Sequence, residues 1–144
     1  MNLQQPSVQT AESAVCGRSI LIIDDDALNL KLFAMTLAGR GYRVLLAMDA
    51  RRGIELACRE RPDLIMMDIQ LPDMSGLEAT RALKQGAVTS GIPVLITTAF
   101  LVDSEELRAS GCDAYLPKPF SGPQLLSALD RLIPPSRPAR SETA

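Results

Sequence analysis

The chain has 144 residues, of which 47% are hydrophobic and 22% are charged, and its formal net charge is −2. This composition supports one globular domain with a single substantial core, and the small negative charge excludes bulk attraction to nucleic acid or to an anionic membrane. Histidine is absent, which excludes Ser/His and Cys/His catalytic arrangements and the common zinc sites.

The three cysteines, Cys16, Cys58 and Cys112, are far apart and form no CxxC pair. We therefore expect reduced thiols rather than a disulfide framework or a structural zinc site. The beginning of the chain has no apolar core like that of a signal peptide. The longest apolar-rich run, Val94 to Val102, is shorter than the ~20 residues needed to span a bilayer. Together these features predict a cytoplasmic protein.

Polar and Pro-rich segments flank the part of the chain that can fold. Residues 1–17 are rich in Gln, Ser and Thr, and residues 134–144 begin with Pro134-Pro135-Ser136. Segments of this composition bury too little apolar surface to fold by themselves. We expect two flexible tails around one folded domain at 18–133.

The first half of that domain alternates apolar runs with helical patterns. The run from Ile20 to Ile23 has no polar alternation, as expected for a strand buried on both faces. Apolar residues at i, i+3, i+4 and i+7 between Leu30 and Leu37 predict an amphipathic helix. A second apolar run at 44–48 precedes a helix over 54–58 that Asp49 can cap.

The alternation continues in the second half. A third apolar run at 63–67 leads to helical spacing at 79–83, and a fourth run lies at 92–97. Asp103 and Glu106 then have the spacing of a capping box at the start of a short helix.

The last unit completes the pattern. A short run at 114–116 is followed by Ser121 and Gln124, another capping-box pair, and by an apolar stripe from Leu125 to Leu132. Five strand–helix units of this length predict an α/β fold, a doubly wound (βα)₅ five-stranded parallel sheet with helices on both faces. Ligands of such sheets bind at the carboxyl ends of the strands.

Polar side chains stand where the predicted strands end. Asp24-Asp25-Asp26 follows the first strand, Asp68 the third, Thr97-Thr98 the fourth and Lys118 the fifth. Crowded carboxylates repel one another, and a hard divalent cation relieves that repulsion. Because the chain offers oxygen ligands and no histidine, the set favours Mg²⁺ over zinc.

The same set of groups can carry out phosphoryl transfer. A carboxylate can attack phosphorus and become an aspartyl phosphate, provided that the equatorial oxygens are neutralised and the donor is held in line. Lys118, fixed between Pro117 and Pro119, and Thr98 supply a cation and a hydroxyl donor. Taken singly, each residue has an ordinary structural explanation, such as a turn, a helix cap or a surface charge. Their joint placement at one end of the sheet favours the site.

Four segments carry a resemblance to a known family. They are Ile20-Leu-Ile-Ile-Asp-Asp-Asp26, Pro62-Asp-Leu-Ile-Met-Met-Asp68-Ile-Gln-Leu-Pro-Asp-Met-Ser-Gly76, Ile92-Pro-Val-Leu-Ile-Thr-Thr-Ala99 and Tyr115-Leu-Pro-Lys-Pro-Phe120. In order and spacing they resemble the signature blocks of response-regulator receiver domains, over residues 18–133. The resemblance implies the flavodoxin-like receiver fold and a role in two-component signalling.

By this resemblance, Asp68 is the phospho-acceptor and Lys118 pairs with the phosphoryl group. Asp24, Asp25 and Asp68 would hold Mg²⁺ together with the backbone carbonyl of Gln70. The peptide bond between Lys118 and Pro119 is usually cis in the family.

Thr98 and Tyr115 resemble the family's switch pair. The hydroxyl of Thr98 would move toward the phosphoryl group and the ring of Tyr115 would turn inward, which changes the face made by the fourth helix, the fifth strand and the fifth helix. Gly76 fits the pattern and is equally explained by turn geometry. We also expect Phe100 to slow the attack of water by covering the site.

The segments Asp26-Ala-Leu-Asn-Leu-Lys-Leu-Phe33 and Thr98-Ala-Phe100 resemble DivK-type single-domain receivers, which regulate histidine kinases in bacteria. No helix-turn-helix, second catalytic domain or basic stripe follows, so we expect output through protein–protein contact. The expected phosphoryl donor is a sensor histidine kinase or a histidine phosphotransfer protein. We expect a monomer or a weak phosphorylation-dependent dimer that is no enzyme beyond self-phosphorylation and slow self-dephosphorylation.

Three alternatives remain at this point. The chain could be a phosphorelay shuttle that passes the group to a downstream histidine, or a receiver scaffold that is never phosphorylated. A haloacid-dehalogenase-type phosphatase would need a second Asp two residues after Asp68, where this chain has Gln70.

Overall fold

The computed structural model describes residues 17–133, and strands and helices alternate throughout this part. The predicted tails at 1–17 and 134–144 lie outside the described residues, apart from Gly17. The elements, in chain order, are β2 (Ser19–Ile23), α1 (Ala27–Gly39), β3 (Arg43–Ala47), α2 (Ala50–Glu60), β4 (Leu64–Asp68), α3 (Gly76–Gln85), β5 (Val94–Thr98), α4 (Ser104–Ser110), β6 (Ala114–Pro117) and α5 (Gly122–Leu132).

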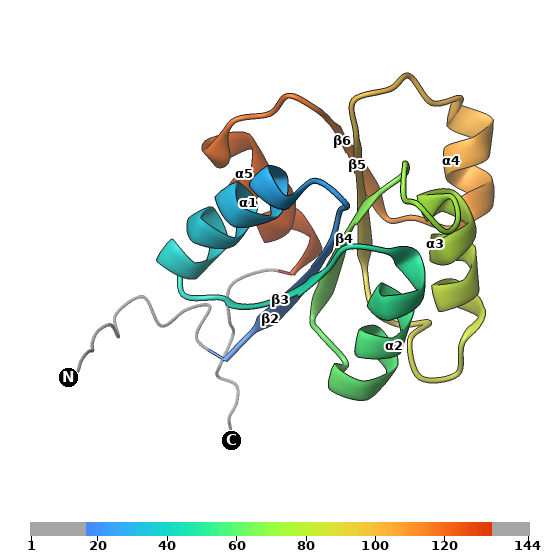
Figure 1. Cartoon of the computed structure of the whole chain (residues 1–144), viewed down its shortest axis with the longest axis horizontal. Coiled ribbons are helices and arrows are strands. Elements are labelled where there is room, and N and C mark those ends of the chain that lie inside the picture. Colours follow the sequence, from blue (N-terminus) through green and yellow to red (C-terminus); the bar gives the residue numbers. More distant parts are fainter. Residues whose placement is uncertain (1–16, 134–144) are drawn as a thin grey trace.

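All five strands form one parallel sheet in the order β3-β2-β4-β5-β6. Counted along the chain, this is the flavodoxin-like order 2-1-3-4-5, so the predicted doubly wound (βα)₅ fold is confirmed. Helices α1 and α5 cover one face of the sheet, and α2, α3 and α4 cover the other (Figure 1). Among residues 17–133, no helix is long and apolar enough to cross a membrane.

The central strands contribute side chains to two hydrophobic cores, one on each face of the sheet. Ile20 and Ile22 of β2 pack with α1 and α5, whereas Leu21 and Ile23 pack with α2 and α3. Every residue of β2, β4 and β5 is buried. Burial on both faces explains why these strands are continuous apolar runs rather than alternating patterns.

Side-chain caps set where the helices begin. Ser121 and Gln124 form the predicted capping box at α5, with both reciprocal bonds present. At α4, Asp103 accepts instead from the amide of Glu105, at 3.4 Å. The capping box predicted between Asp103 and Glu106 is therefore wrong, because the Asp103 carboxylate bonds the second helical amide rather than the third.

Two aspartates join neighbouring strands where those strands begin, an end of the sheet that we call the amino rim. The amide of Asp63 donates to the carbonyl of Ser19, and its carboxylate accepts from the amide of Ser19 at 2.7 Å. Asp113 makes the same pair of bonds with Val94, whose amide lies 2.8 Å from the carboxylate. Each reciprocal pair of hydrogen bonds fixes the register of two neighbouring strands at their first residues, β2 with β4 and β5 with β6.

Candidate functional site

The predicted site residues gather at the opposite end of the sheet, which we call the carboxyl rim. Asp24 directly follows β2, Asp68 is the last residue of β4, Thr98 is the last of β5, and Lys118 directly follows β6. The parallel sheet brings these four chain segments, up to 94 residues apart in sequence, to one place. The topology therefore assembles the side chains that the sequence offered separately.

Three carboxylates and one ammonium form the centre of the site. One oxygen each from Asp24, Asp25 and Asp68 lies within 4.8 Å of the others. The Nζ atom of Lys118 lies 2.8 Å from Oδ2 of Asp24 and 3.5 Å from Oδ2 of Asp68. Asp24 and Asp68 are buried and Asp25 is exposed, so the cluster has one face toward solvent and an excess of negative charge.

The pKa of the Asp68 carboxyl reflects this crowding. Burial raises the pKa above its usual value of 3.8, and the charge of Asp24 raises it further, while the charge of Lys118 opposes both. The net direction is upward. Because one ammonium does not compensate for the burial and the neighbouring charge, the site favours an additional cation.

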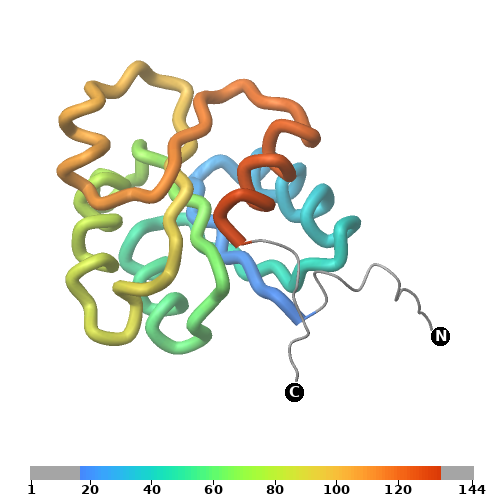
Figure 2. Tube along the Cα trace, turned by 180° about the vertical axis from the view of Figure 1, so that it is seen from behind, coloured from blue at the N-terminus to red at the C-terminus, as the bar shows by residue number. Residues whose placement is uncertain are grey.

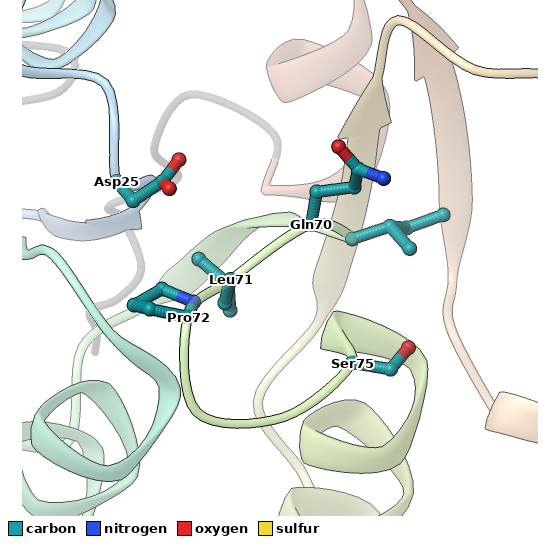
Figure 3. A pocket seen from close by; sticks show the side chains of 6 residues that line it. Asp25, Gln70, Leu71, Pro72 and Ser75 are labelled. Atoms are coloured by element: carbon teal, nitrogen blue, oxygen red, sulfur yellow. The ribbon is translucent and has the colours of Figure 1, made fainter.

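An open cleft of about 220 Å³ lies over these groups. A second hollow of about 450 Å³ lies beside it, between Asp25 and the loop from β4 to α3 (Figure 3). The cleft is lined by Asp24, Asp25, Asp26, Asn29, Asp68, Gln70, Ala99, Phe100 and Lys118. Its polar lining offers oxygen ligands and no imidazole or thiol, and this donor set fits a hard divalent cation such as Mg²⁺.

Gly76 brings helix α3 against the backbone of Asp68. Its amide donates to the carbonyl of Ile69 at 2.7 Å, and a Cβ atom built on it would lie 2.0 Å from the carbonyl oxygen of Asp68. The glycine is therefore required by this close approach, and not by a turn conformation, since Gly76 is the first residue of a regular helix.

Asn29 is a cleft residue to which the sequence analysis gave no role. Its side-chain amide donates to Oδ2 of Asp24 at 3.4 Å, which is the oxygen that Lys118 also contacts. The sequence does contain a signal for this placement of Asn29. Asn29 lies three residues after Asp26, the cap of α1, so it belongs to the first turn of that helix, which faces the carboxyl rim.

The predicted switch residues, Thr98 and Tyr115, are both bonded to the backbone of Phe100. The hydroxyl of Thr98 accepts from the amide of Phe100 at 3.3 Å, and the hydroxyl of Tyr115 donates to its carbonyl at 3.4 Å. Thr98 is buried and Tyr115 is half-buried. One residue of the β5–α4 loop thus connects the two positions.

Two phenylalanines support the lysine. Phe33 of α1 and Phe120, after β6, stack with their ring centroids 5.2 Å apart, and the Nζ atom of Lys118 lies 5.9 Å from the centroid of Phe33. A cation at this distance from a ring face is attracted to it. The peptide bond between Lys118 and Pro119 is cis, as the resemblance implied.

Comparison with known proteins agrees with this geometry. Two curated relatives are the polar-differentiation response regulators DivK of Brucella anthropi and Brucella ovis, 41% and 40% identical over 114 residues, which cover 78% of this chain and 93% of each relative. The chain is thus similar to DivK-type regulators over most of its length.

Solved structures show the same fold. The chemotaxis protein CheY4 of Vibrio cholerae is 30% identical, with a TM-score of 0.77 over 81% of this chain and 98% of that one. The receiver domain of the sensor histidine kinase PA1611 of Pseudomonas aeruginosa, solved with a magnesium ion coordinated in its active site cleft, is 33% identical, with a TM-score of 0.75 and the same coverage.

A family model supplies the last comparison. Residues 20–130, from the second residue of β2 into α5, match the model of the response regulator receiver domain. The chain therefore belongs to the response regulator receiver domain family.

Proposed function

We propose that this protein is a phosphorylation switch of two-component signalling, in which Asp68 accepts a phosphoryl group from a histidine-bearing donor protein. The observation that carries the proposal is the convergence of three carboxylates within 4.8 Å, with an ammonium 3.5 Å from the one that would react. A site for a stable metal alone would not need the ammonium, and a simple ion pair would not need three acids.

In the proposed reaction, a carboxylate oxygen of Asp68 attacks the phosphorus atom of a phosphohistidine. The new P–O bond forms as the P–N bond breaks, and the electron pair stays on the departing imidazole, which takes a proton from solvent. Lys118 and the hydroxyl of Thr98 would contact two of the phosphoryl oxygens. The reacting carboxylate must be ionised, and its contact with Lys118 favours that form.

The residues that would hold Mg²⁺ are Asp24, Asp25 and Asp68, with the backbone carbonyl of Gln70. When bound, the ion supplies positive charge to the phosphoryl oxygens. The magnesium ion in the PA1611 receiver supports this assignment, as do the carboxylate oxygens that line the cleft in this chain.

The donor would dock beside the cleft, on helix α1. Leu28, Leu32 and Met35 lie at i, i+4 and i+7 and are 63%, 50% and 64% exposed, an apolar stripe that a helix of the donor can cover. Leu32 also lines a hollow that shares Asn29, Ala99 and Lys118 with the cleft. A docked donor would therefore have its histidine close to Asp68.

Output would follow from the two residues bonded to Phe100. Withdrawal of the Thr98 hydroxyl toward the phosphoryl group would free the amide of Phe100, and with it the loop that holds Tyr115. The face formed by α4, β6 and α5 would then bind a partner differently in the two states. The proposal places the protein in the cytoplasm, as a regulator whose only reaction is on itself.

The test is phosphoryl transfer from acetyl phosphate in the presence of Mg²⁺, read by intact-protein mass spectrometry. We expect the wild type to gain the mass of one phosphoryl group, and we expect no gain for Asp68→Asn or after chelation of Mg²⁺. The matched control is Asp49→Asn. It changes an acid that caps α2 and does not line the cleft. Asparagine can keep that capping role, and the variant should be phosphorylated normally.

A wild type that gains no phosphoryl group from acetyl phosphate or from a phosphorylated histidine kinase would contradict the proposal. That result would favour a receiver scaffold that is set by binding alone.

A further inference from the structure

The loop between β4 and α3 borders the acid cluster and is fixed by hydrogen bonds at two places. Its base is closed by the bond from the amide of Gly76 to the carbonyl of Ile69, at 2.7 Å, and by the bridge between Gln70 and Ser75. Its tip is held by Asp73, which is exposed. The base and the tip belong to different contacts, so they can be tested separately.

Asp73 binds the first turn of a different helix. Its Oδ1 accepts from the amide of Ala50 at 2.9 Å, and its Oδ2 accepts from the amide of Arg51 at 2.8 Å. Both amides belong to the start of α2, where helical amides have no partner within the helix. The hydrogen bond from the amide of Ala50 is the main cause that lowers the pKa of Asp73 below its usual range. The carboxylate is therefore charged at neutral pH.

The part of the loop between these two anchors faces the acid cluster. Gln70, Leu71 and Pro72 form one wall of the hollow of about 450 Å³, and Asp25 lies on the other side (Figure 3). The contact of Asp73 with the start of α2 fixes the tip of this wall. Without that contact, the segment would be held by its base and by Leu71 and Met74, which pack against the core beneath α2 and α3.

We propose that Asp73 is a positioning residue for the cation site, because it ties the β4–α3 loop to α2 and so keeps Gln70 at the distance from Asp25 that a bound Mg²⁺ requires. The inference rests on the proposed function, in which Gln70 contributes its backbone carbonyl. Asp73 itself touches neither the ion nor the phosphoryl group. Its role is that of an outer-shell group that orients a ligand.

The chain offers a matched control at the same helix. Asp49, the N-cap of α2, accepts from the amide of Arg52 at 2.7 Å. Asp49 directly precedes α2 in the chain, whereas Asp73 reaches α2 from the β4–α3 loop. Asp49→Ala and Asp73→Ala both remove carboxylate caps from the first turn of α2. Only Asp73→Ala also releases the loop.

The experiment measures Mg²⁺ affinity by calorimetry in the full-length wild type and in both variants, without any phosphoryl donor. We expect Asp73→Ala to weaken Mg²⁺ binding by about tenfold, the lower end of the effect of removing an outer-shell partner, and Asp49→Ala to leave it near the wild-type value. Asp73→Asn, which keeps one acceptor oxygen and the fold, should fall between Asp73→Ala and wild type.

Amide hydrogen exchange gives a readout that needs no metal. We expect the amide of Leu71, beyond the base, to exchange faster in Asp73→Ala than in wild type and to be unchanged in Asp49→Ala. The amide of Gly76, which belongs to the base, should stay protected in both variants. Loop exchange that is equal in the two variants would overturn the inference, as would equal Mg²⁺ affinities. A wild type that binds no Mg²⁺ would instead contradict the proposed function, while the exchange data would still decide whether Asp73 holds the loop.

Discussion

The two rims of the sheet carry the same kinds of charged residue in opposite settings. At the amino rim, Asp63 and Asp113 each accept a backbone amide from the neighbouring strand, and Lys84 contacts Asp113 at 2.7 Å. At the carboxyl rim, the acids converge on one another, and Lys118 contacts two of them.

The difference shows how position separates a charge with a fixed structural partner from a charge that is left for a ligand. An acid that meets a strand amide has a fixed, local partner and strengthens the sheet. Acids that mainly face other acids leave charge uncompensated, which costs stability and creates a place for a ligand. Residue type alone does not distinguish the two groups, whereas the end of the strand at which each residue stands does.

The largest effect that would test this comparison comes from the two lysines. Lys118→Ala should slow phosphorylation by acetyl phosphate by about 10²-fold or more, the scale for removing one group that stabilises developing charge. Lys84→Ala should leave that rate unchanged, because Lys84 bonds only groups of the amino rim, Asp113 and the carbonyl of Ile92. Initial rates followed by mass spectrometry give the measurement, and equal losses in the two variants would refute the division between rims.

The second test removes an acid from the amino rim. Asp113→Ala should lower the free energy of unfolding by about 1–3 kcal/mol, because the amide of Val94 and the ammonium of Lys84 lose their shared partner. Urea unfolding followed by circular dichroism measures the change. Phosphorylation of the folded fraction should persist, and a variant that is as stable as wild type would show that this rim contributes little.

The third test uses pH at the carboxyl rim. Because the pKa of Asp68 is raised in the folded state, its ionised form destabilises the fold at pH values above that pKa, and the penalty disappears as the pH falls through it. Asp68→Asn should therefore be more stable than wild type at pH 7, and the difference should shrink as the pH falls toward the ordinary value.

Urea unfolding at several pH values, without Mg²⁺, measures this trend. The matched change at the amino rim, Asp63→Asn, should bring no gain in stability, because the carboxylate of Asp63 already accepts the amide of Ser19. An Asp68→Asn variant that is less stable than wild type at pH 7 would contradict the prediction.

The smallest expected effect concerns the lifetime of the phosphorylated form. Phe100 lines the cleft and is 55% exposed, so it can limit the approach of water to the aspartyl phosphate. Phe100→Ala should shorten that lifetime severalfold, as measured by loss of the phosphoryl mass after the donor is removed. An unchanged lifetime would show that the side chain does not cover the site, and Leu101→Ala, at a fully exposed neighbour, is the control.

Much of this molecule could be predicted from the sequence, because the signals are local. Burial on both faces makes β2, β4 and β5 continuous apolar runs, and the parallel order then brings Asp24, Asp68 and Lys118 together. The observed limits of the strands differ from the predicted ones by one or two residues. For example, β5 begins at Val94, whereas the sequence predicted a start at Ile92. Position 93 is a proline, whose lack of an N–H group explains that later start.

The features that escaped prediction depend on contacts between distant segments. The anchoring of Asp73 to α2 requires the relative position of two loops, which no local pattern encodes. The stack of Phe33 on Phe120 likewise joins α1 to the segment after β6. Gly76 was noticed, but its cause is the backbone of Asp68, and a close approach of that kind is visible only once the chain is folded.

The parallel sheet also determines how the protein can be handled. The first strand begins at Ser19 and the last helix ends at Leu132, both at the amino rim and thus away from the cleft (Figure 2). A fluorophore, an affinity tag or a surface linker attached at either of these residues should therefore leave the carboxyl-rim cleft facing solution. Chains immobilised in this way should keep the cleft open to ligands, which makes the protein suited to sensor chips.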